Sequence, residues 1–217
     1  MDKIKIQLYK KVIELFKKNN PEPATELKYN NSFQLLVAVV LSAQCTDERV
    51  NKITKTLFKK YPDSFEMARA KIEEIYEIIK SCSYPNSKAK YLYQLSNIIA
   101  YEYNGEVPAN FDKLIKLPGV GRKSANVILS ILYKKKTLAV DTHVFRVSQR
   151  IGLVEPTKSF IKVEKELIKY TPEKEIPNLH HWLILHGRYV CKSRKPLCNQ
   201  CFLTNYCNYF KNFSTNI

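Results

Sequence analysis

Lys123 is the residue whose position first suggests covalent chemistry. It lies in "LPGVGRKSANVIL" (117–129), where a turn with two glycines comes just before a predicted helix over 122–133. A cation in the first turn of a helix faces the positive end of the helix dipole, which favours the neutral, nucleophilic amine. We therefore predict that Lys123 is a nucleophile. The alternative is a cation that contacts phosphate, which is the role predicted for Arg122.

Asp141 is the acid that we predict to act with this amine. It stands in "VDTHVFRV" (140–147), directly before a predicted helix over 142–151. If that helix packs beside the helix of Lys123, the carboxylate lies near the amine, where it stabilises developing positive charge or assists proton transfer. The alternative is an ordinary helix N-cap.

Four of the six cysteines are grouped near the C-terminus in a pattern typical of metal ligation. Cys191, Cys198, Cys201 and Cys207 have the spacing C-x6-C-x2-C-x5-C. In a reducing compartment this pattern favours a metal centre over disulfides. Zinc and an iron–sulfur cube both accept four thiolates, and the residues alone leave that choice open.

Three cations lie between the first two of these cysteines. Lys192, Arg194 and Lys195 belong to "KSRKPL". A metal centre that fixes this loop would make it a rigid patch facing phosphate, whereas the alternative is a solvated charged loop. The remaining cysteines, Cys45 and Cys82, are expected in helical surroundings as small apolar side chains.

The glycines of the turn, Gly119 and Gly121, allow the backbone to approach another molecule closely. Backbone N–H groups beside the positive end of a helix bind anions. Because the net charge is +16, the expected anion is a DNA phosphate. The turn could instead be a plain connection between two helices. The positive charge could instead reflect a proteome that is rich in lysine throughout.

Helices must position these groups, because strand patterns are nearly absent. Residues 33–43 are apolar on all sides, which predicts a buried central helix. Asp47, Asp112 and Asp141 are the expected N-caps. Other helices are predicted over 4–18, 47–60, 71–81, 87–103, 111–117, 122–133, 142–151, 158–169 and 176–187. The expected fold class is all-α, with a loop-like C-terminus that carries the cysteines.

Membrane association and export are not expected. No apolar run approaches the ~20 residues of a membrane span, and the N-terminus lacks the apolar block of a signal peptide. We expect a cytoplasmic monomer that joins the nucleoid through DNA.

Together these motifs resemble the endonuclease III family, the iron–sulfur DNA glycosylases of the helix–hairpin–helix superfamily. The resemblance spans residues 30–207 and rests on "LSAQCTDERVNK", "NSKA", "NGEVP", "LPGVGRKSANVIL", "AVDTHVFRV", "HHWLILHGRYVC" and the cysteine spacing. It implies two helical domains flanking a DNA cleft. One is a six-helix barrel over 25–135 with the hairpin at 117–129. The other combines 1–24 with 136–217 and holds a [4Fe-4S] cluster at 191–207.

The resemblance also implies an activity. Lys123 attacks C1′ of a damaged nucleotide flipped out of bent double-stranded DNA, expels the base and forms a Schiff base. β-Elimination then cuts the strand 3′ to the lesion. Asp141 is the essential partner of this lysine, and the four clustered cysteines ligate the [4Fe-4S] cluster. The implied substrates are oxidised pyrimidines such as thymine glycol, together with abasic sites.

The implied DNA contacts include one departure from the family. Gln44 fills the gap left by the flipped base, although it could instead be a helix-end cap. Family members show Gly-Leu-Tyr before "NSKA", where this chain has Ser83, Tyr84 and Pro85. Tyr84 then replaces an aliphatic wedge and stacks on the opposing base. The other implied contacts are Leu117, Gly119, Gly121, Arg122, Arg146, Lys192, Arg194 and Lys195.

Three other functions compete with this interpretation. A monofunctional mismatch glycosylase of the same superfamily lacks the hairpin lysine, so Lys123 argues against it. A non-catalytic DNA-binding protein with a cluster does not account for the pair of Lys123 and Asp141. A ferredoxin-like electron carrier fits poorly with a basic helical chain.

Overall fold

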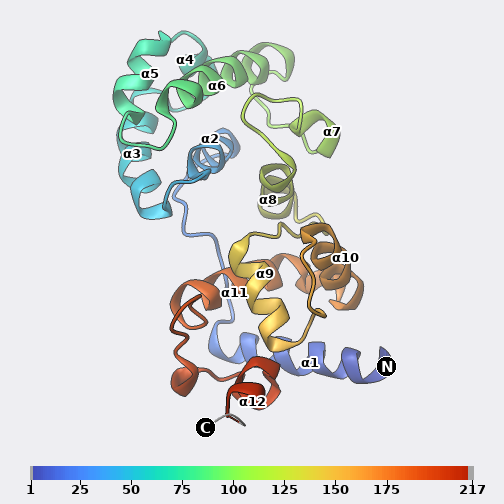
Figure 1. Ribbon diagram of the computed structural model, residues 1–217. Coiled ribbons are helices and arrows are strands. Elements are labelled where there is room, and N and C mark those ends of the chain that lie inside the picture. Colours follow the sequence, from blue (N-terminus) through green and yellow to red (C-terminus); the bar gives the residue numbers. More distant parts are fainter. Residues whose placement is uncertain (1, 215–217) are drawn as a thin grey trace. The chain divides into compact units, whose positions relative to one another are not determined.

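The structure is a computed structural model that describes residues 2–214 (Figure 1). All regular secondary structure in this range is helical, which confirms the predicted all-α class. The chain divides into two compact units. We call Glu26–Lys134 the hairpin unit, and the described parts of Met1–Thr25 and Lys135–Ile217 the cysteine unit.

A single apolar helix, α2 (Ser32–Ser42), is the centre of the hairpin unit. Every residue from Phe33 to Leu41 is buried, so the prediction of a central helix is confirmed. A helix without a polar face must have neighbours on all sides. In Figure 1 the other helices of this unit curve around it. They are α3 (Asp47–Lys60), α4 (Ser64–Ala68), α5 (Ile72–Ile79), α6 (Pro85–Asn97) with a π-helical turn (Ile98–Glu102), α7 (Phe111–Leu114) and α8 (Arg122–Tyr133).

The cysteine unit joins the N-terminal helix to the C-terminal half of the chain. Phe16 stacks on Trp182 with ring centroids 5.6 Å apart, and Trp182 donates from Nε1 to the carbonyl of Asn20 at 2.7 Å. Burying one such aromatic side chain stabilises the fold by about 1.5–3 kcal/mol. The helices of this unit are α1 (Asp2–Asn19), α9 (Thr142–Ile151), α10 (Phe160–Tyr170), α11 (Ile176–Tyr189) and α12 (Asn208–Ser214).

Two of the three predicted N-caps are wrong. The Oγ1 of Thr46, rather than Asp47, caps α3, and the side chain of Asn110, rather than Asp112, caps α7. Both aspartates lie inside the first turn, where the backbone is already helical and the carboxylate is stabilised by the helix dipole. Asp141 caps α9 as predicted.

The turns also differ from the predictions. The C-terminal segment is not simply a loop, because it contains α12 and two short 3-10 turns, Cys198–Gln200 and Thr204–Tyr206. Cys45 and Cys82 lie in the turns between α2 and α3 and between α5 and α6, among helices as expected, with Cys82 buried and Cys45 half-buried.

Candidate functional site

The hairpin turn requires glycine at position 119, whereas the surroundings of Gly121 would accept a side chain. Gly119 has φ +79°, and a Cβ there would lie 3.0 Å from Tyr91 Cδ2 and 3.1 Å from Val40 Cγ1. Gly121 is the N-cap of α8, forms no side-chain cap, and would have no atom within 4 Å of an added Cβ. The first turn of α8 therefore presents its backbone N–H groups on an open surface.

The side chains of the hairpin divide into a buried and an exposed group. Leu117 is 3% exposed and belongs to the core of the hairpin unit. Arg122 and Lys123 are exposed in the first turn of α8, and the Arg122 guanidinium lies 5.5 Å from the ring centroid of Phe111. The turn thus holds a primary amine at a helix N-terminus, as the sequence predicts, while the DNA contact of Leu117 stays a prediction.

Asp141 uses only one of its two carboxylate oxygens as the N-cap of α9. Oδ1 accepts from the backbone N–H groups of His143 at 2.9 Å and Val144 at 2.8 Å. The residue is half-exposed, and Oδ2 stays available to another partner. The expected N-cap is therefore real, and it leaves a second oxygen for chemistry. Lys123 and Asp141 belong to different units.

Gln44 and Tyr84 share an uncommon backbone conformation. Their φ angles are +55° and +56°, in the left-handed region where side chains other than glycine are uncommon. Both are exposed, Tyr84 at 63%. Such strain costs about 1–3 kcal/mol per residue and persists where the surroundings enforce it, often at functional sites.

A hydrogen bond joins the two loops that carry these residues. We call residues 42–46 and 81–84 the paired loops. Ser83 donates from Oγ to the carbonyl of Gln44 at 2.6 Å, and Arg49 donates from Nη1 to the carbonyl of Ser81 at 3.3 Å. Ser83 stands where the resemblance expects glycine, so the departure from the family pattern supplies a bond between the loops.

Lys88 fixes the paired loops from inside. It is 4% exposed, and its Nζ donates to the carbonyls of Leu41 at 2.8 Å and Ala43 at 2.7 Å. The Sγ of Cys82 lies 3.3 Å from the same nitrogen, and burial raises the pKa of this thiol. Lys88 belongs to "NSKA", but no role is predicted for it from the sequence. Its position on the buried face of α6 is the feature that could have indicated one.

The four clustered cysteines line one pocket in the cysteine unit. All four are half-buried free thiols. Burial raises the pKa of Cys198 and Cys207, and that of Cys201 to about 11. The pocket thus disfavours bare thiolates, and a cationic metal centre is what makes four of them stable together. The donor set fits an iron–sulfur cube.

Two polar groups lie against the cysteine sulfurs. The Sγ of Cys201 is 3.4 Å from Nε2 of His186, whose pKa burial lowers to about 4. Arg150 approaches Cys191 Sγ with Nη1 at 3.5 Å. A thiolate only accepts hydrogen bonds, so both nitrogens are donors when the cysteines are ligands.

Two arginines of α9 hold the start of the cysteine segment. Arg146 donates from Nη2 to the carbonyls of Gly187 at 2.9 Å and Cys191 at 3.0 Å. Arg150 donates to the carbonyls of Lys192 and Ser193, both at 2.8 Å. The guanidinium of Arg146 is therefore engaged inside the unit, and its DNA contact stays a prediction.

The basic loop beyond these bonds faces solvent. Lys192, Arg194 and Lys195 are all exposed. Arg150 fixes the backbone at the beginning of the loop, which places three cations on a defined support.

No helix within residues 2–214 combines the length and apolar character that crossing a membrane requires.

Comparison with known proteins relates both parts of the site to DNA repair. Residues 37–173 match the HhH-GPD superfamily base excision DNA repair protein model, and residues 191–207 match the iron–sulfur binding domain of endonuclease III. The endonuclease III of Rickettsia prowazekii is 52% identical over 95% of this chain and 97% of its own. That of Escherichia coli is 42% identical over 91% and 93%, respectively.

Solved structures agree with this relationship. A trapped covalent intermediate of endonuclease III with DNA has a TM-score of 0.89 at 42% identity, covering 96% of this chain and 98% of that one. A thermostable thymine-DNA glycosylase, at 22% identity and a TM-score of 0.83, shares the fold. The sequence alone left zinc and an iron–sulfur cube as alternatives for the four cysteines. The match over 191–207 identifies the site as that of a [4Fe-4S] cluster. The chain belongs to the endonuclease III family of the HhH-GPD superfamily.

Proposed function

We propose that the protein is a bifunctional DNA glycosylase and AP lyase of base excision repair, with Lys123 as its nucleophile. The observation that carries the proposal is an exposed primary amine in the first turn of α8, directly after an N-cap glycine with open surroundings. Backbone N–H groups at this helix end bind a DNA phosphate and position the strand, while the amine meets the sugar.

The Lys123 nitrogen acts in two steps, first as the nucleophile and then, within an imine, as the group that makes elimination possible. The Lys123 nitrogen forms a bond to C1′ as the bond from C1′ to the damaged base breaks, and the base leaves with a proton. Ring opening of the sugar gives an imine, which acidifies the C2′ proton. Loss of that proton breaks the C3′–O bond, so the strand is cut 3′ to the lesion. At an abasic site C1′ is already an aldehyde carbon, so the amine adds to it and water is lost to give the same imine.

Asp141 assists these proton movements through Oδ2. The Oδ1 atom remains bonded to the first turn of α9, which fixes the orientation of the carboxylate. A negative charge close to C1′ stabilises the positive charge that develops as the base departs. Approach of this carboxylate to the amine of Lys123 is part of the proposal.

The paired loops insert into the duplex. Gln44 occupies the gap left by the flipped nucleotide, and Tyr84 stacks on the base of the opposite strand. Both side chains project from strained, exposed positions of loops that are fixed by Ser83 and Lys88. The remaining proposed DNA contacts are Leu117, Gly119, Gly121, Arg122, Arg146, Lys192, Arg194 and Lys195.

Cys191, Cys198, Cys201 and Cys207 hold the [4Fe-4S] cluster. When bound, the cluster supplies four iron–thiolate bonds that cross-link the segment. Arg150 binds two carbonyls at the start of the basic loop, so the loop presents its cations to phosphate in a fixed geometry. We further propose that the enzyme acts as a cytoplasmic monomer on oxidised pyrimidines and abasic sites.

Borohydride trapping tests the nucleophile. The wild-type protein is incubated with duplex DNA that carries one abasic site, and the imine is reduced to a stable amine. We expect a covalent adduct with the wild type and none with Lys123→Ala. Lys116→Ala is the matched control, because Lys116 is an exposed lysine just before the same turn. Undiminished trapping by Lys123→Ala would assign the nucleophile to another amine.

Duplexes with defined lesions test the substrate range. Thymine glycol is expected to be excised with strand cleavage, and 8-oxoguanine in the same sequence is expected to persist. Excision that leaves the strand intact would instead identify a monofunctional glycosylase. Sedimentation of the protein alone and on DNA measures whether one chain or two bind each lesion.

A further inference from the structure

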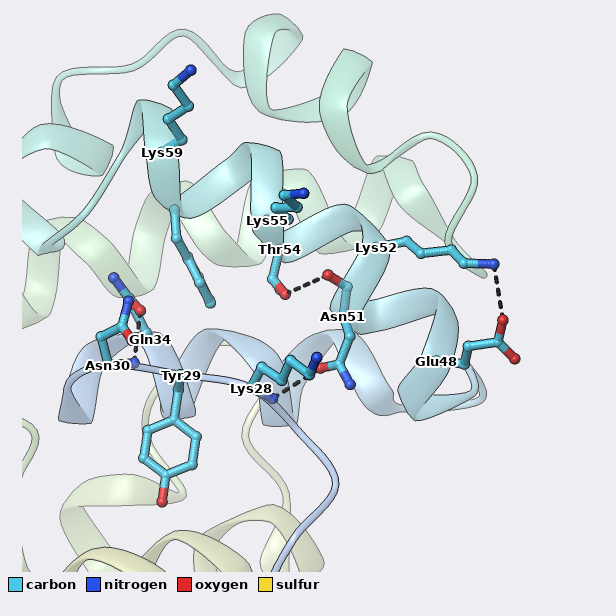
Figure 2. Close-up of a pocket in the computed structure, with 11 residues that line it drawn as sticks. Lys28, Tyr29, Asn30, Gln34, Glu48, Asn51, Lys52, Thr54, Lys55 and Lys59 are labelled. Carbon is cyan, nitrogen blue, oxygen red and sulfur yellow. Dashed lines mark hydrogen bonds and ion pairs between the residues drawn. The ribbon is translucent and has the colours of Figure 1, made fainter.

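The hairpin unit contains a pocket along α3 that is separate from the site residues described above. Its volume is about 630 Å³, and it lies between α3 and the extended segment 28–30 (Figure 2). Ligand pockets of roughly 300–1,000 Å³ accept molecules of nucleotide size. None of its lining residues belongs to the hairpin turn, the paired loops or the cysteine segment.

Two amide side chains, buried Gln34 and half-buried Asn51, hold the extended wall of this pocket. Asn51 accepts from the backbone N–H of Lys28 at 2.9 Å through Oδ1. Gln34, 3% exposed, accepts from the backbone N–H of Asn30 at 2.9 Å and donates to the carbonyl of Pro62 at 3.0 Å. Each end of the segment 28–30 is therefore bonded to a helix, so the wall exists before any ligand binds.

The charge of the pocket is strongly positive and mostly unpaired. Lys52 forms an ion pair with Glu48 at 2.8 Å. Lys28, Lys55 and Lys59 also line the pocket, and no carboxylate among the described residues pairs with them. Lys28 comes from the extended segment and Lys55 from the facing helix (Figure 2). The ammonium group of Lys59 points away from the extended segment (Figure 2), so Lys28 and Lys55 carry the uncompensated charge that attracts an anion into the pocket.

Apolar surface accompanies this charge. Phe58 and Tyr29 both line the pocket and are half-buried against the core of the unit, and the ring of Tyr29 points away from α3 (Figure 2). The ring of Phe58, fixed on α3, offers a flat contact for a base or sugar, and the ammonium groups on the same side contact phosphate. Inorganic phosphate alone would not use this ring, and an acidic peptide would not need it.

We propose that this pocket is a second nucleotide-binding site, which takes a nucleoside phosphate unit either from a DNA strand or as a free nucleotide. Lys55 lies eight residues along α3 from Asp47, where the helix leaves the paired loops. That separation is a rise of about 12 Å, or about four base pairs of duplex. DNA held at the paired loops is long enough to reach the pocket.

The test compares two triple variants of the full, cluster-loaded chain. The pocket variant is Lys28→Gln/Lys55→Gln/Lys59→Gln. The control is Lys3→Gln/Lys10→Gln/Lys165→Gln, which removes the same charge from exposed lysines of the cysteine unit. In the first arm, the dissociation constant for a long duplex with one reduced abasic site is measured over a range of salt concentrations. In the second arm, thymidine 5′-monophosphate is titrated and followed by NMR.

Each outcome of this test supports or overturns the proposal. The first result concerns the slope of log K against log salt, which changes by about 0.9 for each phosphate contacted. If the magnitude of this slope decreases by up to about 2.7 in the pocket variant, and clearly less in the control, the source is a DNA strand. Lost nucleotide binding with an unchanged slope identifies a free nucleotide. Pocket and control variants that behave alike in both arms overturn the proposal. Polyglutamate is titrated in the same way. If it binds the wild type but not the pocket variant, and neither nucleotide effect is seen, the proposal is overturned in favour of an acidic protein partner. Neither arm requires Lys123 to act, so failure here is distinct from failure of the proposed catalysis.

Discussion

Asp141 has two separable roles that substitution can distinguish, because its two oxygens do different things. Oδ1 caps α9 with two bonds, and Oδ2 is the atom assigned to chemistry. Asp141→Asn keeps an oxygen that accepts the same two bonds, but it removes the negative charge. Asp141→Ala removes the bonds and the charge together.

The expected stability losses follow from the cap geometry. Asn and Asp are equivalent N-caps, so Asp141→Asn loses only the interaction of charge with helix dipole, about 0.3–1 kcal/mol. Asp141→Ala also loses the cap itself, about 0.5–2 kcal/mol, for a combined loss of about 1–3 kcal/mol. The Asn variant should therefore have a urea midpoint close to the wild type, and the Ala variant a visibly lower one.

The expected activity losses follow a different order. A positioned acid or base contributes roughly 10²–10⁴-fold to rate, which corresponds to about 3–5 kcal/mol of transition-state stabilisation. Both variants should lose at least about 100-fold in single-turnover cleavage of a duplex with one abasic site, with enzyme in excess. A loss of this size in a folded Asn variant cannot come from its small change in stability.

A cap elsewhere in the same unit provides the control. Ser159 caps α10 by accepting from the N–H of Lys162 at 3.2 Å. Ser159→Ala should lower the free energy of unfolding by about 0.5–2 kcal/mol and leave cleavage unchanged. Wild-type cleavage by Asp141→Asn would refute the reasoning, since the residue would then be a cap and nothing more.

Three further perturbations test the supports of the site. Gly119→Ala should destabilise the protein by about 1–3 kcal/mol in urea, because its φ of +79° and the 3.0 Å approach to a neighbouring ring both oppose a Cβ. Gly121→Ala should cost less, up to about 1 kcal/mol because alanine is a poorer N-cap than glycine, and should weaken binding to abasic DNA; equal stability losses at the two glycines would contradict this assignment. Lys88→Met removes the strong donor shared by the carbonyls of Leu41 and Ala43, so urea unfolding should show a loss of about 1–3 kcal/mol; a stability equal to wild type would mean that the paired loops need no internal donor. His186→Phe removes the donor to Cys201, which should lower the cluster's reduction potential in voltammetry, and an unshifted potential would exclude that hydrogen bond.

Local patterns predicted those parts of the fold that depend on local interactions. The apolar run of α2 has one physical solution, a helix buried on every side, and the structure contains it. The glycines of the hairpin turn were informative for the same reason, because backbone freedom is a property of the residue itself. The caps were harder, since Thr46 and Asp47 are both good N-cap residues and adjacent to each other. Which of them caps α3 depends on where the chain leaves the preceding turn.

The supports of the site could not be predicted in this way. Lys88 looks like a surface lysine in sequence, and only tertiary structure shows it donating to carbonyls more than forty residues away. The same holds for Arg146, which the sequence assigned to DNA and which donates to carbonyls of the cysteine segment. Long polar side chains in helices satisfy backbone groups that other elements leave unpaired, and those groups have no local signature.

The departure at Ser83, Tyr84 and Pro85 is best understood as one coupled change. Pro85 is the first residue of α6, and its ring fixes a φ that suits a helix start. It also disfavours a helical conformation for the residue before it. Tyr84 adopts a left-handed conformation rather than the extended one that usually precedes proline, and it projects outward, 63% exposed. Ser83 then bonds to the carbonyl of Gln44, which itself has φ +55°. Each strained residue is thus held by the loop that carries the other, so removing the Ser83 hydroxyl should loosen both insertion side chains together rather than Tyr84 alone.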